Sequence, residues 1–144
     1  MSTIGFIGVG NMGLPMSANL VKAGYTVRAY DVVPENLKKA KDEGCVAVGS
    51  IAEACGGAET VISTLPEGEH VRDVYLSDGG VIASADPGTL LIDMSTIDLA
   101  SAGDVQRAAK ERGFEMLDAP VSRGTKGARE GTLVIIAGAT DEGF

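Results

Sequence analysis

The chain of 144 residues has little of the chemistry that several protein classes require. It has one histidine, His70, and two cysteines, Cys45 and Cys55, which fit neither a CxxC redox motif nor a zinc cluster, so no metal site is expected. No apolar run approaches the roughly 18 residues that span a bilayer. Acidic residues outnumber basic ones by 20 to 12, and the net charge of −8 argues against nucleic acid and anionic membranes as partners.

The composition is otherwise that of an ordinary globular protein, with 44% hydrophobic residues. Its length predicts a single domain over residues 1–144. Met1, Ser2 and Thr3 lead directly into an apolar run, without the charged and apolar regions of a signal peptide. We therefore expect a cytoplasmic protein whose cysteines are reduced and partly buried.

A glycine-rich segment, Gly8-Val9-Gly10-Asn11-Met12-Gly13, follows the apolar run Ile4–Ile7 and has the spacing of a dinucleotide-binding turn. Gly8 permits a tight turn, Gly10 lets the backbone approach a pyrophosphate, and Gly13 lets the next helix pack on the sheet. The pyrophosphate would rest on N–H groups at that helix's N-terminus, where the macrodipole favours an anion.

Asp31 follows Gly8 by 23 positions, close to the spacing of about 20 at which a carboxylate binds the adenosine ribose hydroxyls. Its charge would repel a 2′-phosphate, so NAD is expected in preference to NADP. The alternative is that Asp31 caps the next helix. Pro34 fits the first helical turn, however, and would place that cap at Val33.

Strand and helix signals alternate along the chain. Strands are expected at residues 4–7, 25–30, 45–48, 60–65, 90–94 and 114–117, and a last apolar run spans 133–137. Helices are expected from the glycine turn to residue 23, and at 34–43, 50–55, 69–76 and 98–112. This alternation predicts an α/β fold of the Rossmann type, a doubly wound and mainly parallel sheet with helices on both faces.

In such sheets ligands bind beyond the carboxyl ends of the strands. The segments expected at those ends are Gly8–Gly13, Asp31, Leu65-Pro66, Ser95-Thr96 and Asp118–Gly124. The sequence therefore predicts that these segments lie along one rim.

Four segments together resemble the β-hydroxyacid dehydrogenase family, which includes 3-hydroxyisobutyrate dehydrogenase and tartronate semialdehyde reductase. They are GFIGVGNMGLPMSANL (5–20), STLPEGEHV (63–71), LIDMST (91–96) and LDAPVSRGTKGAREGTL (117–133). The related 6-phosphogluconate dehydrogenases fit less well, because they do not usually place an acidic residue where Asp31 stands. The resemblance implies an NAD-dependent, homo-oligomeric parent enzyme acting on a small anionic 3-hydroxy acid or its semialdehyde.

The resemblance also implies roles for five residues in cofactor binding. Asn11 and Met12 would lie against the cofactor beside the glycines, and Leu65 and Pro66 would contact its ribose and adenine side. Thr96 would lie near the nicotinamide ribose. The alternatives are that Thr96 caps a helix and that Met12 belongs to the core. His70 is interpreted as a solvated helix residue.

A further segment would bind the substrate. By the resemblance, the Ser122 hydroxyl and the Gly124 N–H help to hold the substrate carboxylate. Between them stands Arg123, where the family usually has glycine, and a guanidinium binds carboxylate or sulfonate-like groups in bidentate fashion. In having arginine here the chain resembles the sulfolactaldehyde reductase branch, so a sulfonated or dicarboxylic semialdehyde is an alternative substrate. A solvent-facing Arg123 is the other interpretation.

The family's catalytic lysine, from a G-x-x-x-K-x-x-N pattern in a following helical domain, has no counterpart here. The sole lysine after Lys110 is Lys126, in an unrelated context, and Thr140 or Asp141 resembles the N-cap of a helix that does not follow. We therefore expect an NAD-binding domain without its C-terminal helical catalytic domain, inactive alone. The alternatives are a non-catalytic NAD-sensing or interaction module and, disfavoured by the two later family segments, a methyltransferase.

Overall fold

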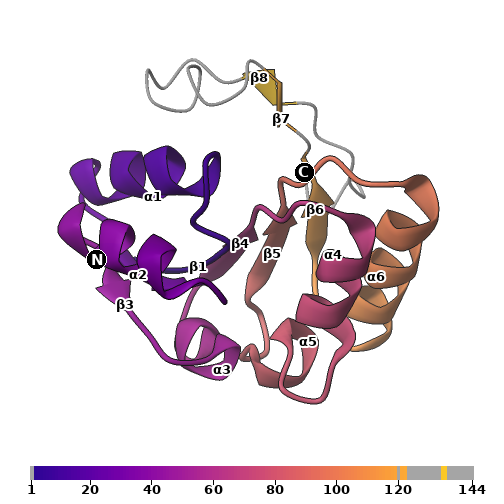
Figure 1. The fold of residues 1–144 in the computed structure, drawn as a ribbon. Coiled ribbons are helices and arrows are strands. Elements are labelled where there is room, and N and C mark those ends of the chain that lie inside the picture. The colour runs from indigo at the N-terminus through magenta and orange to yellow at the C-terminus, as the bar shows by residue number, and fades with distance from the viewer. Residues whose placement is uncertain (1, 120, 123–133, 136–144) are drawn as a thin grey trace.

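The computed structural model describes residues 2–119, 121–122 and 134–135 and contains a six-stranded parallel sheet (Figure 1). Its strand order is β3-β2-β1-β4-β5-β6. The strands are β1 Thr3–Ile7, β2 Thr26–Tyr30, β3 Val46–Ala47, β4 Thr60–Ser63, β5 Leu90–Asp93 and β6 Met116–Asp118. The order reverses between β1 and β4, so the sheet has the topological switch point at which doubly wound folds bind ligands.

Six helices connect the strands: α1 Gly13–Lys22, α2 Pro34–Asp42, α3 Ile51–Cys55, α4 Gly68–Leu76, α5 Val81–Ser84 and α6 Leu99–Glu111. Figure 1 shows α1 and α2 grouped beside β1–β3, and α4, α5 and α6 grouped beside β5 and β6. Side chains alternate between the faces, so Val61 and Leu91 belong to one core and Ile62 and Ile92 to the other. The predicted α/β fold with both faces covered is confirmed.

The two cores differ in which helices supply them. Val71 and Tyr75 of α4 and Val105 of α6 pack on the face of Val61 and Leu91, and Tyr75 and Val105 are fully buried there. On the other face, Leu14, Met16 and Leu20 of α1 and Ala40 of α2 pack against Phe6, Val27 and Ile62. These two layers fix the strand ends relative to one another.

Side-chain caps explain where α3 and α6 begin. The Ser50 hydroxyl accepts a hydrogen bond from the Glu53 N–H (3.1 Å), and the Glu53 carboxylate accepts one from the Gly49 N–H, so side-chain capping begins the helix expected at 50–55. Asp98 caps α6 by accepting from the Ser101 N–H (2.9 Å). Several expected bounds were wrong by one or two residues, and the four-residue helix α5 was not expected.

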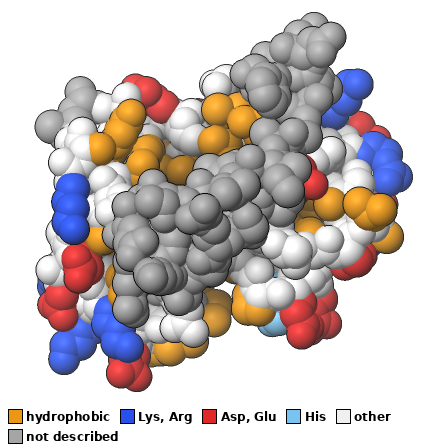
Figure 2. All heavy atoms as spheres, turned by 90° about the horizontal axis from the view of Figure 1, so that it is seen from above, with side chains coloured by type: hydrophobic (Ala, Val, Ile, Leu, Met, Phe, Trp, Pro, Cys, Tyr) orange, Lys and Arg blue, Asp and Glu red, His pale blue; other side chains and the backbone are white. Residues whose placement is uncertain are grey.

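The strand expected at 60–65 ends at Ser63: the Thr64 N–H still donates to the Ile7 carbonyl of β1, but the Leu65 N–H donates to the Ser95 side chain and leaves the ladder. Within the expected 133–137 run, Val134–Ile135 forms β8, which pairs in antiparallel fashion with β7, Val121–Ser122, in a separate two-stranded sheet. Acidic and basic side chains are interspersed around the outline in Figure 2, so the negative net charge is not gathered in one patch of that view. In the part of the chain that the structure describes, every helix is too short or too polar to cross a bilayer.

Candidate functional site

A cavity of about 750 Å³ lies at the carboxyl ends of β1, β2, β4 and β5 and reaches the first turns of α4. All nine residues predicted from the sequence to bind a cofactor line it: Gly8, Gly10, Asn11, Met12, Gly13, Asp31, Leu65, Pro66 and Thr96. Several other residues that line the cavity were not assigned to cofactor binding from the sequence, among them Val32, Val33, Asn36, His70, Asp73 and Met94. The strand ends thus bring together segments that lie far apart in the sequence.

The three glycines of the turn have different environments. Gly8 has φ +93°, and a Cβ there would overlap the Thr64 carbonyl oxygen. A Cβ on Gly13 would overlap the Gly8 carbonyl oxygen, so both glycines are required for packing. The nearest atom to a Cβ on Gly10 is Asn36 Nδ2, at 3.9 Å. This is an ordinary van der Waals contact, so Gly10 is much less enclosed than Gly8 or Gly13, as expected where a backbone must approach a pyrophosphate.

Hydrogen bonds from Thr64 hold the glycine turn in place, and the start of α1 that follows the turn has no side-chain cap. Thr64 donates from Oγ1 to the Gly8 carbonyl (2.7 Å) and from its N–H to the Ile7 carbonyl (3.0 Å). α1 has no side-chain cap and no acidic residue in its first turn. The Leu14 N–H donates to the Gly10 carbonyl (2.9 Å), and the N–H groups that precede it, together with the positive dipole end, are available to an anion.

Asp31 has a fixed orientation. Its Oδ2 accepts from the Val9 N–H at 2.9 Å and its Oδ1 from the Val33 N–H at 2.8 Å. A carboxylate has about four acceptor positions, so Asp31 retains capacity for ribose hydroxyls. Val33 is the N-cap residue of α2, with Pro34 in the first turn, as predicted. The remaining acceptor positions of Asp31 and the uncapped start of α1 beside the glycine turn thus fit the ribose and the pyrophosphate of an adenosine diphosphate group.

A buried polar network, which sequence reasoning missed, lies at the ends of β4 and β5. Asp93 Oδ1 accepts from Ser63 Oγ (2.9 Å), Ser95 Oγ (2.6 Å) and the Ser95 N–H (3.2 Å). Ser63 Oγ contacts Tyr75 Oη at 2.7 Å, and Ser95 Oγ accepts from the Leu65 N–H at 2.7 Å. Asp93 is 2% exposed, and burial raises its pKa while the serine hydrogen bonds lower it.

Two more groups respond to the same environment. Burial raises the pKa of Asp118, which lies next to Asp93 in the register of β5 and β6. Burial, followed by the charge of Asp93, also raises the pKa of Tyr75. Asp93, the polar residue of β5, thus lies between serine hydrogen bonds that favour its charged form and burial and Asp118, which disfavour it.

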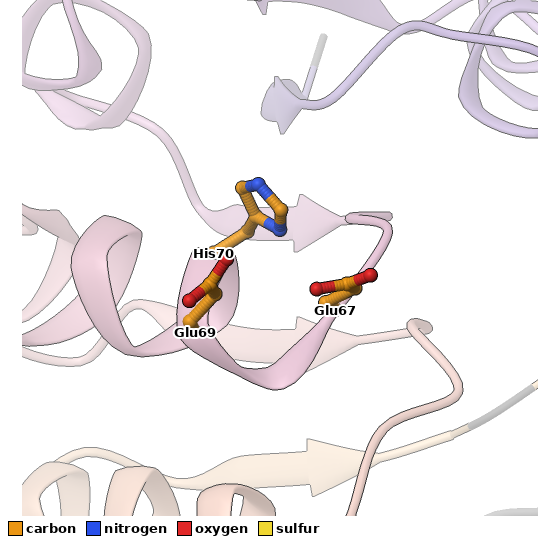
Figure 3. A group of neighbouring side chains, drawn as sticks. All are labelled: Glu67, Glu69 and His70. Carbon is orange, nitrogen blue, oxygen red and sulfur yellow. The ribbon is translucent and has the colours of Figure 1, made fainter.

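Glu67, Glu69 and His70 form the one group of possible metal ligands among the described residues, with ligand atoms within 4.8 Å of one another (Figure 3). All three side chains are exposed, as predicted for His70. They surround the N-terminus of α4, whose positive dipole end attracts carboxylates and repels a cation. We assign no metal to this group.

The predicted substrate segment is described only in part. Ser122 lies in β7, where its backbone is in register with Val134 of β8. Arg123, Gly124 and Lys126 lie outside the described residues. Cys45 and Cys55 are both buried and unpaired, and burial raises the pKa of Cys55 to about 12, so this thiol is unreactive.

Residues 3–144 match a family described as the NAD binding domain of 6-phosphogluconate dehydrogenase. The chain belongs to this family. It is 47% identical to a 3-hydroxyisobutyrate dehydrogenase of Pseudomonas aeruginosa, over all of this chain and 48% of that protein. It is 46% identical to an NAD-dependent L-serine dehydrogenase of the same organism, over 99% of this chain and 48% of that protein.

A solved structure shows the same fold. The 3-hydroxyisobutyrate dehydrogenase of Mycobacterium tuberculosis, determined with L-serine, superposes with a TM-score of 0.95 at 45% identity, covering 99% of this chain and 48% of that one. The chain therefore spans about half the length of its relatives. It is an NAD-binding domain of the type found in 3-hydroxyisobutyrate dehydrogenases, and the cofactor predicted from the glycine turn is confirmed as NAD.

Proposed function

We propose that the protein to which this chain belongs uses NAD to oxidise a small 3-hydroxy acid to its semialdehyde, or catalyses the reverse reduction. The observation that carries this proposal is the oriented Asp31 carboxylate beside an open glycine turn, in a chain 47% identical to a 3-hydroxyisobutyrate dehydrogenase. The family match names 6-phosphogluconate dehydrogenase, whereas the relatives above favour the smaller substrate class.

The relatives' names support one substrate chemistry. 3-Hydroxyisobutyrate, L-serine and 2-(hydroxymethyl)glutarate, the last from a relative 38% identical over 98% of this chain, all carry a hydroxymethyl group next to a carbon that bears a carboxylate. Oxidation moves a hydride from the hydroxymethyl carbon to nicotinamide C4 and the hydroxyl proton to a base, which leaves the C=O group.

The residues of this chain would bind and orient both molecules. Asp31 accepts from the adenosine ribose, the start of α1 holds the pyrophosphate, and Thr96 lies beside the nicotinamide ribose. Ser122 and Gly124 hold the substrate carboxylate. A lysine in a C-terminal helical domain, beyond residues 1–144, would accept the hydroxyl proton.

The experiment follows NADH formation from NAD with 3-hydroxyisobutyrate, L-serine or 2-(hydroxymethyl)glutarate. We expect the 144-residue chain to bind NAD with negligible turnover, and the same chain extended by its downstream coding sequence to oxidise at least one of the three. Turnover by the 144-residue chain would mean that Lys126 or another group replaces the missing base. An extended protein that binds NAD but oxidises none of them would favour the non-catalytic NAD-sensing or interaction module.

Arg123 bears on the substrate class. We propose that it binds a second anionic group, a carboxylate or sulfonate, because it stands between the two residues expected to hold the first. A charge-assisted pair of this kind is worth about 1.5 to 3 kcal/mol, or roughly ten- to a hundredfold in kcat/KM. In the extended protein, Arg123→Gly should lose that factor on 2-(hydroxymethyl)glutarate and not on 3-hydroxyisobutyrate. Equal losses, or none, would assign Arg123 to solvent or to loop structure.

The remaining proposals concern the location, the partners and the oligomeric state of the protein. A cytoplasmic location is supported by the two unpaired buried cysteines, which suit a reducing compartment. The acidic composition supports a protein without nucleic-acid or membrane partners. A homo-oligomeric parent enzyme rests on the family resemblance, and light scattering of the extended protein would test it.

A further inference from the structure

The buried network has a direction. A hydroxyl donates one hydrogen bond, and because Ser63 Oγ donates to Asp93, it must accept from the Tyr75 hydroxyl. In the same way Ser95 Oγ donates to Asp93 and accepts from the Leu65 N–H. Every donor in the series therefore points toward the Asp93 carboxylate, which is its single terminal acceptor.

The network joins two loops of the cavity wall. Leu65 lies just after β4 and Ser95 just after β5, and both line the cavity. Ser95 is held by two hydrogen bonds to Asp93, one from its N–H and one from its hydroxyl. The same hydroxyl accepts from the Leu65 N–H, so Asp93 also fixes the position of Leu65 through Ser95. Thr96 is the next residue in the chain, so the hydrogen bonds between Ser95 and Asp93 also fix its position.

The distance across the sheet indicates which part of the cofactor this wall receives. Asp31 follows β2 and Ser95 follows β5, three strand spacings apart in the order β2-β1-β4-β5. At about 4.8 Å for each spacing this is roughly 14 Å. With its ribose at Asp31 and its pyrophosphate at the start of α1, a dinucleotide extends its nicotinamide half toward Ser95.

Packing alone gives no reason for a carboxylate here. Asp93 shares its face of the sheet with the apolar Val61 and Leu91, and a buried carboxylate is costly unless its bonds are complete. Replacing a complete buried polar pair or network by well-packed apolar residues is often neutral or stabilising. Stability alone therefore does not account for a carboxylate at this position, whereas the loop geometry that the network fixes does.

We propose that Asp93 is a positioning residue for the nicotinamide half of NAD: through Ser95 it holds the loops after β4 and β5 in the shape that receives this half. The proposal rests on the cofactor placement given under the proposed function. It assigns Asp93 no contact with the cofactor or the substrate. Tyr75 and Ser63 support the carboxylate from the side away from the loops.

The experiment compares two ligands of the 144-residue chain by calorimetry, NAD and ADP, since ADP lacks the nicotinamide half. Asp93→Ala and Ser95→Ala should weaken NAD binding by about ten- to a hundredfold while ADP binding stays within about threefold. Asp93→Asn keeps an oxygen acceptor in place and should recover part of the loss. Ser95→Ala leaves Asp93 in place, so it remains informative if Asp93→Ala fails to fold.

Thr89→Val is the matched control. Thr89 is 3% exposed, immediately precedes β5 at the end opposite Asp93, and donates from its hydroxyl to the Ala58 carbonyl at 3.1 Å. Its replacement should lower thermal stability and leave the ratio of NAD to ADP affinity unchanged. If the Asp93 and Ser95 variants weaken both ligands equally, or neither, Asp93 is only structural and the proposal is wrong. An unaltered chain that binds neither ligand would instead overturn the cofactor placement itself.

Discussion

The two sides of the cavity hold their polar groups in different ways. On the β1–β2 side, the half-buried carboxylate of Asp31 accepts only from backbone N–H groups, those of Val9 and Val33. On the β4–β5 side, the carboxylate of Asp93 is buried and accepts mainly from the side chains of Ser63 and Ser95. The first arrangement leaves acceptor capacity for a ligand, whereas the second uses a carboxylate to shape the wall.

The comparison teaches that two aspartates at equivalent strand ends can have different functions. Exposure separates them: a carboxylate open to the cavity can bind a ligand, and one sealed beneath it can only orient its neighbours. The same distinction applies to the glycines, because a Cβ on Gly8 would overlap backbone atoms, whereas one on Gly10 would make only an ordinary van der Waals contact.

The largest expected effect separates the two glycines. Gly8→Ala places a side chain at φ +93° against the Thr64 carbonyl and should cost about 3 kcal/mol or more in the free energy of unfolding. Gly10→Ala should change that free energy by less than about 1 kcal/mol yet weaken NAD binding at least about tenfold. Urea unfolding and calorimetric titration give the two values.

The control for this pair is Gly79→Ala, at a glycine with no atom within 4 Å of an added Cβ. It should leave stability and binding almost unchanged. If Gly10→Ala binds NAD normally, the pyrophosphate does not approach the turn, and the placement of the cofactor would have to be revised.

The next effect concerns the choice between NAD and NADP. Asp31→Asn removes the charge that repels a 2′-phosphate and should reduce the preference for NAD, by about 1.5 to 3 kcal/mol or roughly ten- to a hundredfold. Asp31→Ala should also narrow the preference, and in addition weaken NAD binding because the Val9 N–H loses its acceptor. Titration with both cofactors measures this, and equal or tighter NADP binding by the unaltered chain would contradict the assignment.

A smaller effect is expected on the buried side. Tyr75→Phe removes one donor to Ser63 and should lower the free energy of unfolding by about 1 kcal/mol. NAD affinity should change little, because Asp93 still holds Ser95. Tyr25→Phe, at a tyrosine that is 41% exposed, is the matched change and should be neutral in chemical denaturation. A large loss of NAD binding in Tyr75→Phe would mean that Tyr75, and not Asp93, holds the loops in position.

The smallest expected effect is a change in how the free energy of unfolding depends on pH. Burial raises the pKa of Asp93 in the folded protein, so its contribution to stability is fully present below the unfolded pKa of about 3.9 and is lost as pH rises through the folded pKa. The stability of the unaltered chain relative to Asp93→Asn should therefore decrease from about pH 4 toward neutrality. Denaturation curves at several pH values test this, and parallel pH profiles would mean that Asp93 does not titrate there. Asp118, whose pKa is raised in the same direction, titrates in both proteins.

The β1–β2 side could be predicted from the sequence because its rules are local. A positive φ at Gly8 and the spacing to Asp31 are properties of short segments, and Pro34 identified the start of α2. The network on the other side joins Ser63 to residues 12 and 30 positions away, so it depends on the register of β4 with β5 and on the docking of α4. An aspartate at the end of an apolar strand, LLID, was the one available signal.

Other parts of the prediction met similar limits. The helix α5, Val81–Ser84, is too short for a periodic pattern to indicate it. The pairing of β7 with β8 crosses eleven residues outside the described ones and follows no two-residue turn signal. For Arg123 and Gly124 the substrate roles stay predictions.

The pairing of β1 has a consequence for the order in which the protein forms. Ile4 pairs with Val27 on one side and with Thr60 on the other, and the Gly8 carbonyl receives its bond from the Thr64 hydroxyl. During synthesis from the N-terminus, β1 and β2 can therefore associate early, but the central strand waits for its second neighbour until residue 60 has left the ribosome. The glycine turn is translated before β4 and completed only after β4 has paired with β1, so the nascent chain acquires its cofactor site only after the second half of the sheet has docked.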